Sequence, residues 1–185
     1  MLSQMKIVYQ GQIKSGKEIV IRYPEIGDVL DMLNFINTVS DEKTFLSYQG
    51  EHETLKSEGR YIKKCIKNIK SKKLIKLLAF NGDKLVGQTD IEMGDRVERH
   101  IGLFGLVVAK DFRGKGLGKK LMELVEVESK KNLPNIKIIK LEVYGTNEIA
   151  RNLYKKIGFV EYGILPGGIS RNKTFEDTVL MYKNI

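Results

Sequence analysis

The segment from Gly105 to Leu121 restricts the fold of this chain more than any other stretch. It starts with Leu106 to Ala109, a short apolar run with two β-branched residues, which is typical of a buried strand. Glycine then occupies the alternate positions Gly114, Gly116 and Gly118. Apolar residues at helical spacing overlap and follow them: Leu117, Leu121, Leu124 and Val125. The segment therefore predicts a strand, a glycine-rich turn and a helix.

This turn has the properties of an anion-binding site. Glycine lets the backbone approach a ligand closely, and the first N–H groups of a helix have no partner within the helix. The helix dipole favours negative charge at the same place. Four cations surround the turn: Arg113, Lys115, Lys119 and Lys120. A phosphate or pyrophosphate is therefore the first hypothesis for the ligand.

Two common phosphate-binding patterns fit this turn poorly. A P-loop requires Ser or Thr directly after its lysine, and neither follows Lys115 or Lys119. The dinucleotide fingerprint Gly-x-Gly-x-x-Gly has a different glycine spacing and opens an alternating strand–helix chain. Here the turn lies past the middle of the chain. A nucleotide site of either kind is not predicted.

The turn does resemble the acetyl-CoA-binding motif of the GCN5-related N-acetyltransferases, Gln/Arg-x-x-Gly-x-Gly/Ala. Arg113, Gly116 and Gly118 match this motif, and Leu106 and Val108 match the Leu-x-Val strand that precedes it in the family. A second family block, Asn-x-x-Ala-x-x-Leu-Tyr-x-x-x-Gly-Phe, is matched by Asn147, Ala150, Leu153, Tyr154, Gly158 and Phe159. The order and separation of the blocks agree as well, so the chain resembles this family over most of its length.

The resemblance, which covers roughly Ile19 to the C-terminus, implies a fold and a cofactor. We expect an α/β (α+β) fold with a mixed, mostly antiparallel central sheet, flanked by helices and splayed between the family's fourth and fifth strands. These correspond to the strand ending at Ala109 and the strand around 138–143. The pantetheine arm of acetyl-CoA is expected to bond to the exposed strand backbone there, as an added strand would. The expected cofactor contacts are Leu106, Val107, Val108, Arg113, Gly114, Lys115, Gly116, Leu117, Gly118, Lys119, Asn147 and Tyr154.

Acetyl transfer from a thioester to an amine requires a neutral amine, a stabilised oxyanion and a proton for the departing thiolate. The resemblance implies that a backbone N–H near Val108 meets the oxyanion. It also implies that Tyr154 serves the sulfur, as a general acid or as a positioning hydrogen bond. From its helical position alone, Tyr154 fits plain packing. Asn147 fits a helix N-cap as well as a ligand contact.

Sequence spacing singles out no general base. In addition to Tyr154, His100 is our second candidate catalytic residue. Histidine titrates near neutral pH, and related acetyltransferases often carry one at the start of the strand expected at 100–109. A purely structural histidine is the alternative. Four acids are further candidates: Glu42, Glu53, Asp90 and Glu92. A water relay, or an amine that arrives neutral, would need no dedicated base. Asp177 precedes the final strand, where several family members have an acid, and its alternative is a turn residue.

The chain of 185 residues is long enough for one domain and too short for two ordinary ones. We expect a single N-acetyltransferase domain over 1–185, with an N-terminal hairpin at about 5–23 and an acetyl-CoA-binding core at about 100–160. Helices are expected at 28–39, 54–70, 116–131 and from 147. The apolar side of the first is predicted to be Val29, Leu30, Leu33 and Ile36.

Strands are expected between these helices and after the last of them. Asn81-Gly82-Asp83 is a strong hairpin signal between strands at 73–80 and 84–93. The last two strands are expected at 159–165 and 178–183, joined by a flexible loop around Pro166-Gly167-Gly168.

Composition narrows the class of protein. The net charge of +9 suits a polyanion, which can be coenzyme A or a nucleic acid, but lysine-rich composition also arises from genome bias. Arg60 to Gly82 contains eight Lys or Arg residues and no acid, which predicts either a docking face for an acidic partner or a plain solvated helix face. Cys65 is expected to be a buried packing residue, and two histidines without a Cys-x-x-Cys argue against a metal site. No transmembrane run or signal peptide is present, so a cytoplasmic location is expected.

These observations lead to one expected function with alternatives. We expect an acetyl-CoA-dependent N-acetyltransferase that acts by direct transfer in a ternary complex on a small-molecule amine or amino acid. The alternatives are a protein N-terminal or lysine acetyltransferase of the ribosomal-protein type, and a non-catalytic acetyl-CoA sensor. The expected partners are acetyl-CoA and an amine, with a homodimer left open and with neither a membrane nor a nucleic acid.

Overall fold

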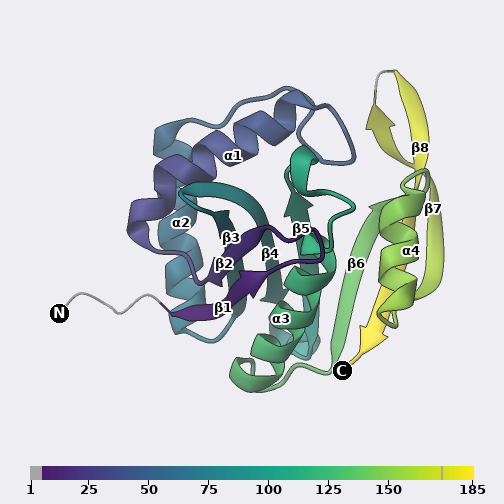
Figure 1. Ribbon diagram of the computed structural model, residues 1–185. Coiled ribbons are helices and arrows are strands. Elements are labelled where there is room, and N and C mark those ends of the chain that lie inside the picture. The colour runs from purple at the N-terminus through teal and green to yellow at the C-terminus, as the bar shows by residue number, and fades with distance from the viewer. Residues whose placement is uncertain (1–5, 172) are drawn as a thin grey trace.

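One eight-stranded sheet runs through the computed structural model, which describes residues 6–171 and 173–185 (Figure 1). The strands are β1 (Ile7–Gln12), β2 (Glu18–Arg22), β3 (Leu74–Asn81), β4 (Lys84–Met93), β5 (Ile101–Val108), β6 (Ile138–Tyr144), β7 (Val160–Arg171) and β8 (Thr174–Asn184). Their order in the sheet is β1-β2-β3-β4-β5-β6-β8-β7. Only β5 and β6 pair in parallel, which confirms the expected mixed, mostly antiparallel sheet. The start of the hairpin expected at about 5–23 lies outside the described residues.

Four α-helices flank this sheet: α1 (Val29–Asp41), α2 (Leu55–Lys70), α3 (Leu117–Asn132) and α4 (Glu148–Lys156). α1 and α2 pack on one face against Leu78 and Phe80, and α3 packs on the other face against Leu77 and Ala79. β3 is buried at every position except its last because helices cover both of its faces. Its sequence is accordingly an almost continuous apolar run.

β5 and β6 stay together over only part of their length. Ile101, Gly102 and Leu103 pair with β6, and beyond Leu103 the two strands separate. In Figure 1 they are close at one end and apart at the other. This is the opening that the resemblance implied, between the strand ending near Ala109 and the strand around 138–143. Counted along this chain, however, they are the fifth and sixth strands rather than the fourth and fifth, because β1 and β2 both precede the first helix.

The apolar side predicted for α1 was only partly confirmed: Val29 packs against the core, but the fully buried residues are others. The helix buries Met32, Phe35 and Val39, whereas Leu30 is 55% exposed. Both sides of this helix carry apolar residues, so helical spacing did not distinguish them. Contact with α2 and the β3–β4 hairpin determines which side is buried.

The flexible loop expected at Pro166-Gly167-Gly168 was wrong. These residues lie inside β7, where the register to β8 shifts between Leu165 and Ile169. A bulge suits them because proline has no N–H for a ladder hydrogen bond. Gly168 also has no room for a side chain, since an added Cβ would lie 2.5 Å from the Thr178 hydroxyl. The final hairpin is therefore longer than predicted.

Four other expectations concern α2 and the helices in general. Thr54 caps α2, the helix expected at 54–70, and Cys65 is buried as expected. The outer face of α2 is exposed at each of its expected cations: Arg60, Lys63, Lys64, Lys67 and Lys70. An acidic partner for this face stays a prediction. None of the helices in 6–171 and 173–185 combines the length and apolar character needed to cross a bilayer.

Candidate active site

The glycine-rich turn at the end of β5 presents unpaired backbone donors. Gly116 precedes α3 with φ of +89°, and Gly114 has φ of +70°. This left-handed conformation costs other residues about 1–2 kcal/mol, which explains glycine at both positions. No side chain caps α3, and its first turn contains no acid. The N–H groups at the start of α3 are thus available to an anion, which fits a pyrophosphate.

Gly118 lies in the first turn of α3 and faces the space between β5 and α4. A Cβ added there would lie 3.6 Å from Leu153 of α4 and 3.7 Å from Leu106 of β5. Those are ordinary contact distances, so a methyl group fits. A long side chain would project between β5 and α4. The structure therefore brings both blocks of the sequence motif to this space.

The cations around the turn are largely engaged with the protein itself. The Arg113 Nε donates to the Val108 carbonyl at 2.8 Å, and its Nη2 lies 2.6 Å from the Glu42 carboxylate. Lys115 donates to the backbone carbonyl of Asp111. Arg113 thus joins the turn to the end of α1, and Glu42, one of the candidate bases, serves as its partner.

Sequence reasoning missed a neighbour of the turn. The β1–β2 hairpin reaches it, and a Cβ added to Gly116 would lie 3.1 Å from the Lys14 Cβ. The basic turn Lys14-Ser15-Gly16-Lys17 was visible in the sequence, but no spacing connects it with a segment about a hundred residues away. Lys14 adds a cation to the surroundings of the anion site.

The β5 backbone past Leu103 has no strand partner on its β6 side in the described part of the chain. The expected contacts Leu106, Val107 and Val108 all lie in this unpaired stretch. Unsatisfied backbone groups at a strand edge accept an added strand or an extended ligand. This edge therefore fits the pantetheine arm.

Tyr154 projects from α4 toward the start of the opening. Its side chain is buried, and its ring packs edge-on against Phe104, with centroids 6.0 Å apart. Phe104 is the first residue of β5 beyond the paired part. Burial raises the pKa of Tyr154 to about 12, so the hydroxyl keeps its proton at neutral pH. Asn147 caps α4 through a 3.2 Å hydrogen bond from the Ala150 N–H to its Oδ1.

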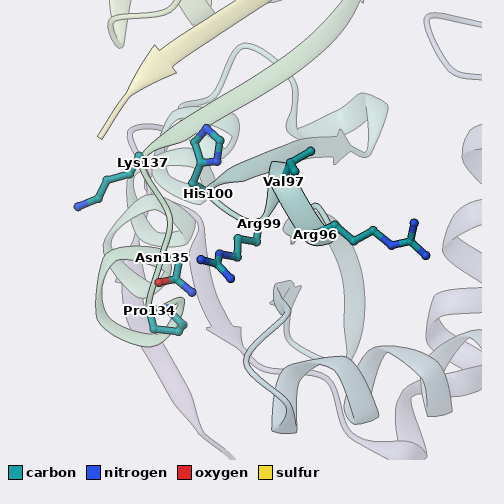
Figure 2. A pocket seen from close by; sticks show the side chains of 7 residues that line it. All are labelled: Arg96, Val97, Arg99, His100, Pro134, Asn135 and Lys137. Carbon is teal, nitrogen blue, oxygen red and sulfur yellow. The ribbon is translucent and has the colours of Figure 1, made fainter.

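His100 lies at the other end of β5, just before the closed part. Its carbonyl accepts hydrogen bonds from the N–H groups of Lys137 and Ile138. The side chain lines a surface pocket together with Arg96, Arg99 and Lys137 (Figure 2). The paired residues of β5 and β6 thus separate His100 along the strand from the level of Tyr154. Its role as general base stays a prediction.

A buried ion pair lies beside the opening, on the face that α1 and α2 cover. The Lys76 Nζ is 2.9 Å from Asp90 Oδ2 and 3.2 Å from the Tyr61 hydroxyl. Burial lowers the pKa of Lys76, but Asp90 and Tyr61 outweigh it and raise the pKa above its usual value, so this lysine is charged. Asp90 was one of four candidate acids, whereas Lys76 was missed. Its signal was a single lysine within the apolar run of 74–80.

The loop between α1 and α2 is hydrogen-bonded to β6 and β7, across the opening from β5. The Tyr144 hydroxyl donates to the Leu46 carbonyl at 2.7 Å, and the Phe45 ring meets the Tyr144 ring edge-on at 5.5 Å. Arg171 of β7 donates to the Thr44 carbonyl at 3.1 Å. The sequence did not predict these contacts of the loop, because the residues that make them are far apart in the chain.

Another candidate acid, Asp177, has a structural role. Its Oδ1 accepts a hydrogen bond from the Gly167 N–H at 3.0 Å, and its carbonyl accepts one from the Gly145 N–H at 2.8 Å. It lies inside β8 rather than before the final strand. These contacts give Asp177 a structural role within a strand, so the alternative of a turn residue was wrong.

Comparison with known proteins identifies the family. The model of the acetyltransferase (GNAT) family matches residues 39–159, which is more than half of the chain. The chain belongs to the GNAT family. A GNAT-family acetyltransferase from Streptococcus pneumoniae is 32% identical, with 91% of this chain and 100% of that chain covered and a TM-score of 0.82. This GNAT protein is therefore an acyltransferase with acetyl-CoA as its acetyl donor.

Two more distant structures share the fold alone. A ribosomal-protein-alanine N-acetyltransferase from Brucella melitensis is 18% identical, with 89% of this chain and 99% of that chain covered and a TM-score of 0.77. A ribosomal L7/L12 α-N-protein acetyltransferase, solved with coenzyme A, is 10% identical, with 97% and 98% covered and a TM-score of 0.81. The fold of this GNAT chain is thus common to proteins of widely different sequence.

Proposed function

We propose that the chain transfers an acetyl group from acetyl-CoA to a primary amine, directly and within a ternary complex. The observation that carries this proposal is the parting of β5 and β6 at Phe104, between the open N-terminus of α3 and the buried Tyr154 ring. The acceptor in this proposal is a small-molecule amine or an amino acid. A cytoplasmic location is part of the proposal, and a homodimer is left open.

Each part of the site has a role in the proposed reaction. Acetyl-CoA supplies the thioester carbonyl that the amine attacks. The first N–H groups of α3 bind its phosphates, and the unpaired backbone of Leu106 to Val108 holds the arm. A backbone N–H near Val108 faces the oxyanion. The Tyr154 hydroxyl, which is protonated at neutral pH, gives its proton to the departing sulfur.

A second acceptor class has its own support. The exposed cations of α2 form a face that suits an acidic protein, and two structures with this fold are named ribosomal-protein acetyltransferases. The amine would then be a protein N-terminus or a lysine. A domain that binds acetyl-CoA without turnover is the non-catalytic alternative.

Calorimetric titration with acetyl-CoA, followed by a free-thiol release screen, tests these proposals. The screen covers polyamines, amino acids, aminoglycosides and short peptides. We expect binding and thiol release with a small amine. Release with peptides alone would favour the protein acceptor, and binding without release would favour the sensor. Absence of acetyl-CoA binding would overturn the proposed function.

A further inference from the structure

One row of residues crosses the sheet on the face that α1 and α2 cover and ends at the opening. Lys76 of β3 lies opposite Asp90 of β4, and Asp90 lies opposite Gly105 of β5. Paired residues of neighbouring strands point to the same face of a sheet. Gly105 is only two residues beyond Leu103, where pairing with β6 stops. The row therefore brings a carboxylate to the edge of the active site.

The two oxygens of Asp90 have different surroundings. Oδ2 accepts the hydrogen bond from the Lys76 ammonium, whereas Oδ1 extends over Gly105. A Cβ added to Gly105 would lie only 2.7 Å from Oδ1. The missing side chain at Gly105 is thus what allows the carboxylate to occupy this position. The Asp90 side chain is 28% exposed, and Oδ1 has no hydrogen-bond partner among the described residues that would compete with a ligand.

Lys76 holds this carboxylate in a fixed place. Its side chain is 1% exposed, and the Tyr61 hydroxyl of α2 contacts it from above the sheet. A buried ammonium needs its partners, so Asp90 cannot swing away without leaving a charge unpaired in the interior. The oxygen over Gly105 is therefore positioned in advance of any ligand.

Asp90 and Tyr154 lie on opposite faces of β5 at the same level. Phe104 contacts Tyr154, and the next residue, Gly105, lies beneath the Asp90 carboxylate. Successive residues of a strand point to opposite faces. A nucleophile that approaches on the Asp90 face thus meets the proposed thioester from the side opposite the proton donor of the leaving group.

We propose that Asp90 binds the ammonium form of the acceptor through Oδ1 and takes one of its protons, with Lys76 as the positioning residue. In this step an N–H bond of the ammonium breaks and an O–H bond forms on the carboxylate. The electron pair stays on nitrogen, and a cation and an anion become two neutral groups. The acceptor class is therefore an aliphatic amine that is protonated in water. The inference rests on the proposed function.

Two substitutions test Asp90 in different ways, and one serves as a control. Asp90→Asn keeps an oxygen for Lys76 but removes the charge. Gly105→Ala keeps Asp90 but puts a methyl group only 2.7 Å from the present position of Oδ1, so the carboxylate must shift. Asp95→Asn removes the partner of the exposed Lys73 from the loop that follows β4, far outside the row. The probes are spermidine, L-lysine and tobramycin, and the probe with the greatest thiol release is used for every variant.

For both Asp90→Asn and Gly105→Ala we expect kcat/KM for the amine to fall by about 100-fold or more, as for loss of acid–base catalysis. Calorimetric binding of the amine to protein saturated with coenzyme A should be lost too. The acetyl-CoA affinity of Asp90→Asn should stay close to that of the wild type. Its urea midpoint should fall, because the buried Lys76 ammonium loses its counter-charge. Asp95→Asn should be unchanged in all respects.

Several outcomes would overturn the inference. One is a wild-type protein that binds none of the three amines. Another is a pair of variants that keep kcat/KM for the amine within about threefold of the wild type. Equal loss of acetyl-CoA affinity and amine turnover would make Asp90 a structural residue. In each case acetyl-CoA binding with thiol release by the wild type would still support the proposed function, so the two failures are distinguishable.

Discussion

The two halves of the site along β5 are built differently. At the C-terminal end of the strand, one contiguous segment from Leu106 to Gly118 supplies the strand edge, the turn and the helix N-terminus that fit the cofactor. Near the middle of the strand, the proposed acceptor side combines Lys76, Asp90 and Gly105 from three strands. The first half consists of backbone groups, and the second consists of side chains that meet only in the folded sheet. Different substitutions should therefore damage each half separately.

The largest effect is expected from Gly118→Glu on the cofactor half. A carboxylate in the first turn of α3 would compete with the phosphates for the N–H groups, and like charges cost several kcal/mol, which predicts a loss of acetyl-CoA affinity of about 100-fold or more. Calorimetry measures it. Gly118→Ala is the control, because a methyl group fits at 3.6 Å from Leu153. Unchanged affinity in Gly118→Glu would separate this turn from the cofactor.

Tyr154→Phe should affect chemistry and leave both binding halves intact. The Phe ring keeps the packing against Phe104, so we expect kcat to fall by about 100-fold while the acetyl-CoA affinity stays the same. Steady-state kinetics and calorimetry measure the two quantities. Tyr162→Phe, at an exposed position of β7, is the matched control. Equal loss of affinity and turnover would make Tyr154 a packing or binding residue.

Lys76→Met should show that the acceptor half depends on buried charge. Removing Lys76 leaves the Asp90 carboxylate, which is 28% exposed, without its counter-charge, so the free energy of unfolding should fall by about 1–3 kcal/mol, with Asp90→Asn in the same chain restoring part of it. Urea denaturation measures the change. Lys73→Met, which breaks the exposed pair with Asp95, should leave the urea midpoint almost unchanged. Equal effects of the two substitutions would contradict a special role for the buried pair.

Alkaline pH should reveal the burial of Tyr154. Its pKa in the folded protein is raised to about 12 from the usual 10.0 by burial. Its contribution to stability is therefore fully present below about pH 10, the unfolded value, and is lost as the pH rises toward 12. The urea midpoint should fall less steeply between these two pH values in Tyr154→Phe than in the wild type. Parallel curves would mean that the hydroxyl is not buried in solution.

The smallest effect is expected from His100→Ala. This side chain lines the surface pocket beyond the closed end of β5 and β6, away from both halves of the site. If Asp90 takes the proton, kcat/KM and its pH profile should be unchanged. A loss of activity with an altered pH profile would favour His100 as the general base and contradict the proposal that Asp90 takes the proton.

Some features were predicted only in part, because the partners of a side chain or segment depend on residues far away in the sequence, which local spacing does not specify. Arg113 matched the cofactor motif, but its guanidinium bonds the Val108 carbonyl and Glu42 of the distant α1 region. The Pro166-Gly167-Gly168 segment was predicted to be a loop, but it forms a bulge within β7, because β8 continues beside it. In both places long-range packing decided the outcome.

The sequence by itself determined the proposed cofactor half of this protein, because strand, glycine turn and helix N-terminus follow one another within a few residues. Only the tertiary structure decided the acceptor half. Asn81 pairs with Lys84 and Phe80 with Leu85, and that register, if continued, would set Lys76 opposite Thr89. The irregularity between Ala79 and Phe80 shifts the register by one residue and sets Lys76 opposite Asp90 instead. Since a one-residue shift moves side chains to the other face of a sheet, this bulge is what places the carboxylate on the face of the buried lysine.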